Sequence, residues 1–204
     1  AHLVTNHRFV GHFQDWLSNQ GSAANQEERA HGGLRITIHD DGTSSNEDRL
    51  GAVGDVRFVL DAEDIHDDVL VCAADNILQW KLNDLLKTWK QNYEFHICVR
   101  YEEDHADLKK RGNAVLDADG RGVEFVEKPE DPKSNWAVPP FYIYPAASLH
   151  LVAQYLEQGA GDAPGEFVEW LFARIPVYAH KIDGTILDIG NPESLEQARR
   201  AFDK

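Results

Sequence analysis

Apolar and polar positions along the chain alternate between two spacings, one typical of strands and one typical of helices. Residues 69–74 (Val-Leu-Val-Cys-Ala-Ala) form a continuous apolar run, which suits a strand covered by helices on both faces. Helical spacing of leucines and a tryptophan follows over residues 82–89, and strand alternation returns over residues 95–99. This repeated exchange of strand and helix predicts an α/β domain with a parallel-type sheet.

The other segments continue the same exchange. Further strands are expected at residues 3–5, 34–38, 114–116, 123–126, 141–144 and 177–180. Further helices are expected from the cap Asn6 to Leu17, at 50–60, 147–157 and 166–173, and after the cap pair Asn191-Pro192. Residues 21–33 predict a mobile surface loop, and 117–120 (Asp-Ala-Asp-Gly) a hairpin turn. Without repeats or a linker, residues 1–204 predict a single domain, a three-layer α/β/α sandwich.

Charge and cysteine content narrow the class of partner. A formal net charge of −15 argues against nucleic acid and anionic membranes, which are bound by excess Lys and Arg. Cys72 and Cys98 each lie in an apolar strand-like run, so a disulfide framework is not expected. A location in the reducing cytoplasm is expected instead. No apolar run is long enough to span a bilayer.

Asp75-Asn76 directly follows the apolar run of residues 69–74. Ligands of open α/β sheets bind at the carboxyl ends of the strands, so this carboxylate is a candidate for the binding crevice. Asp-Asn is also a common turn pair that bonds its own backbone, and position alone does not separate the two interpretations.

Two further polar groups stand at strand ends. Asp188 lies between apolar residues and precedes a glycine and a capped helix, so it is either a carboxylate with a specific partner or a turn residue. Glu127-Lys128-Pro129 ends the strand at 123–126. Lysine suits a phosphate and glutamate accepts hydrogen bonds from sugar hydroxyls, although a surface salt pair would look the same.

Taken in order, these segments resemble those of the sugar-1-phosphate nucleotidyltransferases, especially members like glucose-1-phosphate thymidylyltransferase. The resemblance rests on Asp75-Asn76, on Glu127-Lys128-Pro129 and on residues 188–195 (Asp-Ile-Gly-Asn-Pro-Glu-Ser-Leu). Residues 49–55 resemble the family's base-binding turn, and residues 3–6 its second strand. It covers essentially the whole chain and implies a Rossmann-like nucleotide-diphospho-sugar transferase fold with a mostly parallel mixed sheet.

The resemblance also implies a reaction and roles for the matching residues. Such enzymes join a sugar 1-phosphate to a nucleoside triphosphate and release pyrophosphate. By the same resemblance, Asp75 and Asp188 would bind Mg²⁺, Lys128 the sugar phosphate, and Glu127 the sugar hydroxyls. Asn76, Gly51 and Gly112 would complete the substrate site, with Gly51 against the base and Gly112 against the sugar. A homo-oligomer is compatible with this assignment.

Three departures from the family pattern accompany the resemblance. The family's first strand and its Gly-rich, Arg-bearing phosphate loop do not precede Ala1, so we expect this chain alone to lack turnover. Arg111 stands where the family usually has Tyr, and Ala74 where it usually has Gly. A non-catalytic nucleotide-sugar-binding or regulatory fragment of the same fold therefore stays open, as does a different acceptor such as phosphocholine. The sequence leaves the base and the sugar undetermined.

Overall fold

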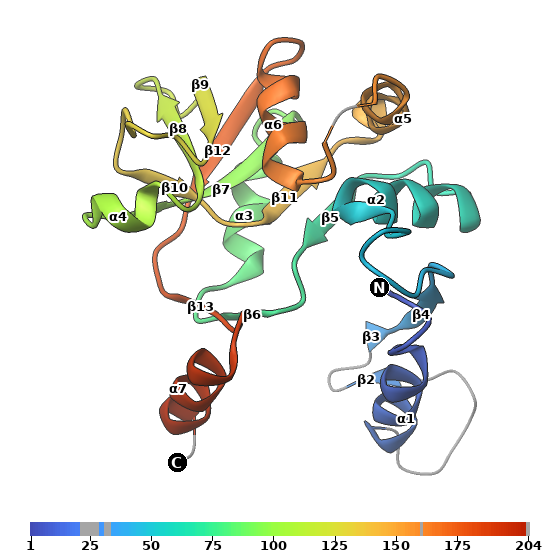
Figure 1. The fold of residues 1–204 in the computed structure, drawn as a ribbon. Helices are drawn as coiled ribbons and strands as arrows, with labels where there is room; N and C mark the ends of the chain where they lie inside the picture. Colours follow the sequence, from blue (N-terminus) through green and yellow to red (C-terminus); the bar gives the residue numbers. More distant parts are fainter. Residues whose placement is uncertain (21–28, 31–33, 160, 203–204) are drawn as a thin grey trace. The chain divides into compact units, whose positions relative to one another are not determined.

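The computed structural model describes residues 1–20, 29–30, 34–159 and 161–202 (Figure 1). These residues divide into two compact units. The first unit comprises residues 1–66 and 152–163, and the second comprises residues 67–151 and 164–204. Since the chain enters the first unit twice, neither unit is one contiguous segment, and the single domain 1–204 stays a prediction.

The first unit is built on a parallel pair of strands with a helix following each strand. The elements are β1 (His2–Thr5), α1 (Val10–Gln20), β2 (Arg29–Ala30), β3 (Leu34–Arg35), β4 (Thr37–Asp40) and α2 (Gly51–Ala62). Strands β1 and β4 pair in parallel, with Val4 opposite His39. Asn6 was expected to cap α1, but the helix begins only at Val10, and the Asn6 side chain accepts from the Arg8 amide in a local turn. Most of the predicted loop at 21–33 lies outside the described residues.

The second unit contains a seven-stranded sheet in which β7 is central. Its strands run in the order β5 (Val69–Cys72), β11 (Phe141–Tyr144), β7 (Phe95–Tyr101), β10 (Trp136–Val138), β8 (Gly112–Leu116) and β9 (Gly122–Glu127), with β12 (Val177–Lys181) also on β7. A separate antiparallel ladder joins β6 (Asn76–Leu78) to β13 (Ile186–Asp188). The remaining elements of this unit are α3 (Leu82–Trp89), α4 (His105–Leu108), η1 (Ala146–Ser148), α6 (Pro164–Phe172) and α7 (Pro192–Phe202). Helix α5 (His150–Glu157) begins in the second unit, and its residues from 152 onward belong to the first.

Helices α3 and α6 cover opposite faces of this sheet. Leu85 and Trp89 of α3 pack in one buried cluster with Cys98 of β7. The ring of Phe95, three positions earlier on the same strand, packs on Tyr144, which in turn contacts Phe167 of α6. Because side chains alternate across a strand, positions 95 and 98 point to opposite faces. The second unit is therefore layered helix, sheet, helix, as the sequence predicted.

The strand directions correct one expectation. In the seven-stranded sheet only β12 with β7 is parallel, and the other pairs are antiparallel. The parallel pairs among the described strands are therefore β12 with β7 and β1 with β4. The sheet is mixed, but the predicted predominance of parallel pairing is wrong for this part of the chain.

Strand β5 also differs from its prediction. It lies at one end of the described sheet, pairs with β11 alone and alternates between half-buried and exposed residues. Leu70 is 37% exposed and Cys72 is exposed, whereas Cys98 of the central strand is fully buried. The expectation that the apolar run at 69–74 is covered on both faces is therefore wrong. The strand that is buried on both faces is β7.

Local signals of turns and caps are confirmed. The hairpin β8–β9 turns at residues 117–120, where the Asp117 carboxylate accepts from the amides of Asp119 and Arg121 and Gly120 has φ of 80°. Helix α7 begins where Asn191 accepts from the Ser194 amide at 2.9 Å. Among the described helices, none has the length and apolar character needed to cross a membrane.

Candidate active site

The β6–β13 ladder brings the two predicted magnesium ligands to neighbouring backbone positions. Asp188 of β13 is paired with Asn76 of β6. The amide of Ile189 donates to the carbonyl of Asp75 at 2.7 Å. The two aspartates therefore meet across an antiparallel ladder, and not at the carboxyl edge of a parallel sheet as the sequence had suggested.

The side chains at this ladder are polar and open to solvent. Asp75 is exposed, and its carboxylate accepts a hydrogen bond of 2.6 Å from the side-chain amide nitrogen of Asn76. The side-chain oxygen Oδ1 of Asn76 is buried without a partner among the described residues. The Asp188 side chain is 43% exposed. The sequence left Asp188 either as a carboxylate with a specific partner or as a turn residue; in the structure the Arg111 guanidinium lies 3.5 Å from its carboxylate.

Arg111 also connects this ladder to the Glu127-Lys128 segment. Its carbonyl accepts from the Lys128 amide at 3.2 Å, and the next residue, Gly112, stands opposite Glu127 in the β8–β9 ladder. The side chain of Arg111 is 30% exposed, yet its Nε is buried with no partner among the described residues. Arg111 thus links the Glu127-Lys128 segment to Asp188, which the ladder pairs with the Asp75-Asn76 segment.

Glu127 occupies a half-buried position against the start of α6. Its carboxylate fills the space where a side chain at Gly165 would begin, and its amide donates to Glu169 at 2.9 Å. Burial raises the pKa of the Glu127 carboxyl, Lys128 opposes this rise, and the negative charges of Glu166 and Glu169 add to it. A carboxyl in this environment is well suited to exchange hydrogen bonds with uncharged hydroxyl groups.

Lys128 is held in an unusual backbone conformation. Its φ is 49°, in the left-handed region that residues other than glycine seldom adopt. The side chain is 62% exposed, and its ammonium lies 3.9 Å from the Glu127 carboxylate. The local turn therefore presents a cation to solvent beside the half-buried carboxyl, at some cost in backbone strain.

The two predicted glycines are both required by close packing. At Gly112 a Cβ would overlap the Phe125 ring and approach the Glu127 carboxylate. Gly51, in the first unit, has φ of 75°, and a Cβ there would overlap the Asp162 side chain. Both positions are therefore limited to glycine by the protein itself, and a close approach of substrate to their backbones stays a prediction.

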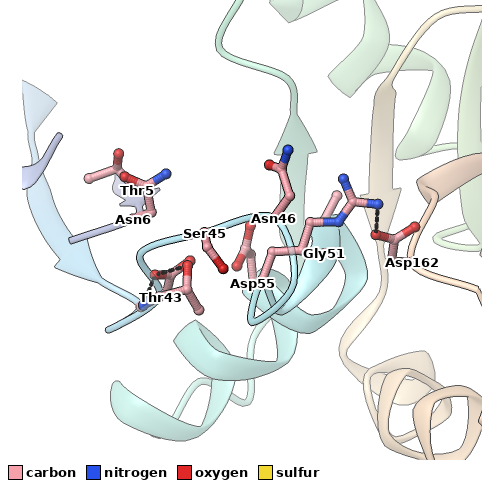
Figure 2. A pocket seen from close by; sticks show the side chains of 11 residues that line it. Thr5, Asn6, Thr43, Ser45, Asn46, Gly51, Asp55 and Asp162 are labelled. Atoms are coloured by element: carbon pink, nitrogen blue, oxygen red, sulfur yellow. Dashed lines mark hydrogen bonds and ion pairs between the residues drawn. The ribbon is translucent and has the colours of Figure 1, made fainter. Parts of the chain in front are cut away.

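Gly51 lies in a pocket of the first unit with a volume of about 410 Å³ (Figure 2). We call it the Asp55 pocket. Its lining is mostly polar and comes from the ends of β1 and β4, the start of α2 and the segment before α6: Thr5, Asn6, Asp41, Thr43, Ser45, Asn46, Arg49, Gly51, Ala52, Asp55 and Asp162. Two of the lining residues, Arg49 and Asp162, form an ion pair of 2.7 Å.

Asp55 is the most perturbed group of this pocket. One of its carboxylate oxygens is buried without a hydrogen-bond partner among the described residues. Burial, with a smaller contribution from the negative charge of Asp41, raises the pKa of Asp55 to about 6. A carboxyl that is near its titration point and lacks a protein partner can donate to or accept from a ligand in the pocket.

Comparison with known proteins identifies the family to which this chain belongs. The sequence profile described as nucleotidyl transferase matches residues 15–204, which include the β6–β13 ladder, the Glu127-Lys128 segment and the Asp55 pocket apart from Thr5 and Asn6. The chain belongs to the nucleotidyl transferase family. The family predicted from the ordered motifs is thereby confirmed.

Individual nucleotidyl transferases agree with this assignment. The UTP–glucose-1-phosphate uridylyltransferase of Haloferax volcanii is 31% identical over 152 residues, a match that covers 72% of this chain and 62% of that protein. The chain thus corresponds to less than two thirds of that relative's length.

Two solved structures share the fold. One, from Bacillus anthracis, bears the name glucose-1-phosphate thymidylyltransferase and was solved in complex with sucrose. It matches with a TM-score of 0.71 at 21% identity, covering 98% of this chain and 74% of its own. The UTP-bound UGPase of Acinetobacter baumannii matches with a TM-score of 0.67 at 18% identity, covering 84% and 61%. The predicted Rossmann-like α/β fold is confirmed.

The structure gathers six of the seven predicted site residues of this nucleotidyl transferase in the second unit. They are Asp75, Asn76, Gly112, Glu127, Lys128 and Asp188, and the seventh, Gly51, lines the Asp55 pocket. Their roles stay predictions. Sequence reasoning noted Arg111 only as a departure from the family and did not assign functions to Gly165, Asp55 or Asp162. A signal existed for Asp55, because this carboxylate ends the segment 49–55 that resembles the family's base-binding turn.

Proposed function

We propose that this nucleotidyl transferase acts on a sugar 1-phosphate and a nucleoside triphosphate, forming a nucleotide-sugar and pyrophosphate. The observation that carries the proposal is the adjacency of Asp75 and Asp188 across the β6–β13 ladder, linked through Arg111 to Lys128. A pyrimidine nucleotide and glucose 1-phosphate are the first substrates to test, because the relative from Haloferax volcanii bears the name UTP–glucose-1-phosphate uridylyltransferase.

Asp75 and Asp188 suit Mg²⁺ in donor type. Both offer exposed carboxylate oxygens, and Mg²⁺ is usually bound by one or two carboxylates together with water and substrate phosphates. Arg111 at 3.5 Å from Asp188 is a competing cation, so it would have to turn away or share that carboxylate. When bound, the ion would neutralise charge on the phosphates.

Lys128 and Glu127 bind different parts of the sugar phosphate. The exposed ammonium of Lys128 donates to the phosphate, and the half-buried Glu127 exchanges hydrogen bonds with sugar hydroxyls. The sugar phosphate is then positioned with an ionised oxygen free to attack the α-phosphorus of the triphosphate. One phosphorus–oxygen bond forms, the bond to the β-phosphate breaks, and pyrophosphate leaves with the electron pair. No general base is needed, because the attacking phosphate oxygen is already ionised.

The Asp55 pocket is the proposed site of the nucleotide base. Its volume suits a nucleoside, and Gly51 lines it without a side chain that would keep a base from the backbone. Asp55, Thr43 and Ser45 supply polar side chains that can pair with the edge of a pyrimidine (Figure 2).

The proposal is tested by calorimetric titration of the chain with UDP-glucose and dTDP-glucose in Mg²⁺, alongside an assay of pyrophosphate release. We expect saturable binding that Asp75→Asn and Asp188→Asn each weaken by about tenfold or more. Asp183→Asn, which changes an exposed aspartate five residues before Asp188, should leave the affinity unchanged. If neither UDP-glucose nor dTDP-glucose binds, the proposal is contradicted.

A non-catalytic nucleotide-sugar-binding protein is the second candidate. The ion pair between Arg111 and Asp188 favours it, because the arginine already neutralises a carboxylate that a metal would use. Nucleotide-sugar binding whose affinity is unchanged by Mg²⁺ would support this candidate. If nucleotide-sugar affinity depends more strongly on Mg²⁺ in Arg111→Gln than in the wild type, the enzyme is favoured instead.

A further inference from the structure

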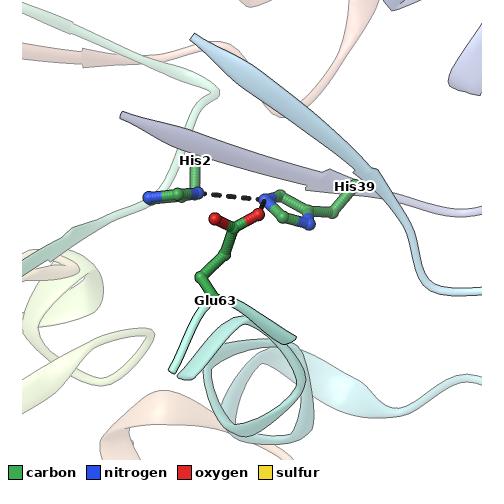
Figure 3. Close-up of side chains that lie close together, drawn as sticks. All are labelled: His2, His39 and Glu63. Carbon is green, nitrogen blue, oxygen red and sulfur yellow. Dashed lines mark hydrogen bonds and ion pairs between the residues drawn. The ribbon is translucent and has the colours of Figure 1, made fainter. Parts of the chain in front are cut away.

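Two histidines and a glutamate converge in the first unit (Figure 3), and none of the three lines the Asp55 pocket. Nδ1 of His2 lies 3.0 Å from Nε2 of His39, and a carboxylate oxygen of Glu63 lies 3.5 Å from the same Nε2. One atom from each residue can be chosen so that all three lie within 4.8 Å of one another.

The fold explains why these residues meet. In the parallel pair β1–β4, Val4 stands opposite His39, and His2 lies two residues before Val4. Side chains two apart on a strand share a face, so His2 and His39 project from the same side of the pair. Helix α2 lies against this side, with its Phe58 ring edge-on to the His39 ring at 6.2 Å. Glu63 directly follows α2 as its C-cap residue.

Hydrogen bonds alone account poorly for this convergence. Nε2 of His39 carries either one proton or one lone pair, yet both His2 and Glu63 approach it. An ion at the common point could accept a lone pair from each of the three side chains. Two ligand atoms bound at about 2.1 Å in a tetrahedral site lie roughly 3.4 Å apart, close to both separations seen here.

We propose that His2, His39 and Glu63 form a binding site for a divalent transition-metal ion, with Zn²⁺ as the natural probe. Imidazole nitrogen with one carboxylate is a donor set that Zn²⁺ accepts readily and that Mg²⁺, which prefers oxygen, does not. His39 is 9% exposed, whereas the Glu63 side chain is 36% exposed, so an ion can enter from the glutamate side. Three protein ligands leave a fourth position for water.

This site would act on the first unit rather than on phosphate chemistry. Its ligands come from β1, β4 and the end of α2, so a bound ion ties these three elements together. An ion that binds only the folded unit stabilises it in proportion to the logarithm of its concentration.

The test is a titration of the protein, prepared without a histidine tag, with Zn²⁺ in a competing chelator. We expect one equivalent bound, and a fall in affinity of about tenfold or more in His2→Ala and in Glu63→Gln. Excess Mg²⁺ should not displace the ion. His2 and Glu63 are solvent-accessible, so these variants should fold, and circular dichroism without metal checks that they do.

His7 and His66 provide matched controls within the same unit. Each is an exposed histidine beside a single aspartate, His7 with Asp40 and His66 with Asp64. Changing either to alanine should leave zinc affinity unchanged. Binding of Co²⁺ should give intense visible absorption, a mark of four-coordination, in the wild type but not in the double variant of His2→Ala with Glu63→Gln. Equal zinc affinity of wild type and double variant would overturn the proposal, as would a failure to bind one equivalent.

Discussion

Gly165 in the first turn of α6 leaves the space that the Glu127 carboxylate occupies. In Gly165→Ala the new methyl group would overlap that carboxylate and displace it. If Glu127 binds the sugar, affinity for a sugar 1-phosphate or a nucleotide-sugar should fall by about tenfold, the loss of one hydrogen bond to a charged group. Calorimetric titration with UDP-glucose measures this.

The matched control for Gly165→Ala is Gly11→Ala. Gly11 also lies in a helix, and a Cβ there meets nothing within 4 Å. That variant should bind as the wild type does and be equally or slightly more stable, since alanine favours helix over glycine. Wild-type affinity in Gly165→Ala would show that the position of Glu127 is unimportant for binding.

Asp55 makes the stability of the free protein depend on pH. Its pKa is about 6 in the folded protein against 3.8 as the ordinary value, so folding favours the protonated form. The stability that this group contributes is complete below about pH 4 and is lost as the pH rises through 6. At pH 7.5 the folded protein carries the full cost of a half-buried, unpaired carboxylate.

Asp55→Asn should therefore raise the free energy of unfolding at pH 7.5, by about 2 kcal/mol after allowance for partial exposure. The difference from wild type should shrink steadily toward pH 4.5 in urea denaturation. Asp48→Asn is the control of opposite sign, because hydrogen bonds from the Ser45 and Ser44 amides lower the pKa of Asp48. An Asp55→Asn variant less stable than wild type at pH 7.5 would refute this account.

At the scale of elements, the last helix depends on its cap. Asn191 accepts from the Ser194 amide, and Pro192 occupies the first helical position. Asn191→Ala should lower the free energy of unfolding by about 1 kcal/mol, whereas Asn191→Asp should retain most of it. Chemical denaturation followed by circular dichroism compares the three proteins, and equal loss in both variants would show that the cap is not the cause.

Capped helices and turns of this kind were predictable because their signals are local. Asn191-Pro192, the turn at 117–120 and the helix at 82–89 each appear where the sequence placed them. Strands β8 and β9 were also close to prediction, whereas the roles of Gly112 and Glu127 came from the family resemblance.

Burial of the strands was harder to predict, because it depends on partners far away in sequence. The alternation of β7 suggested one exposed face, yet His96 is 1% exposed, with its ring nitrogen bonded to the Glu94 carbonyl. The uninterrupted apolar run of β5 suggested two covered faces, yet Leu70 is exposed. Pairing also decides the site: the contact of Arg111 with Asp188 needs both β8 and β13 in place, and no local pattern contains it.

At the scale of the molecule, charge repulsion opposes folding. The chain has 35 acidic residues against 20 basic ones, a formal net charge of −15. Like charges brought together by folding repel, and salt weakens this over a screening length of about 10 Å at 0.1 M. Raising sodium chloride from low concentration to 1 M at pH 7.5 should therefore raise the melting temperature by several degrees.

Varying sodium chloride near the isoelectric point separates the screening of charge repulsion from other effects of salt. At about pH 5, where the net charge is close to zero, sodium chloride should change the melting temperature much less. A salt effect of equal size at both pH values would point to general salting-out of apolar surface instead.

The different environments of the two cysteines have a practical consequence for spectroscopy. Cys72 is exposed at the end of β5, whereas Cys98 is enclosed in the central strand, where burial raises the pKa of its thiol. A maleimide dye should therefore attach to the natural protein at one position, three residues before Asp75, without removal of a competing thiol. Partial burial raises the pKa of the Cys72 thiol as well, so the coupling is best carried out at mildly alkaline pH. The dye would report by its brightness when a ligand occupies the neighbouring ladder.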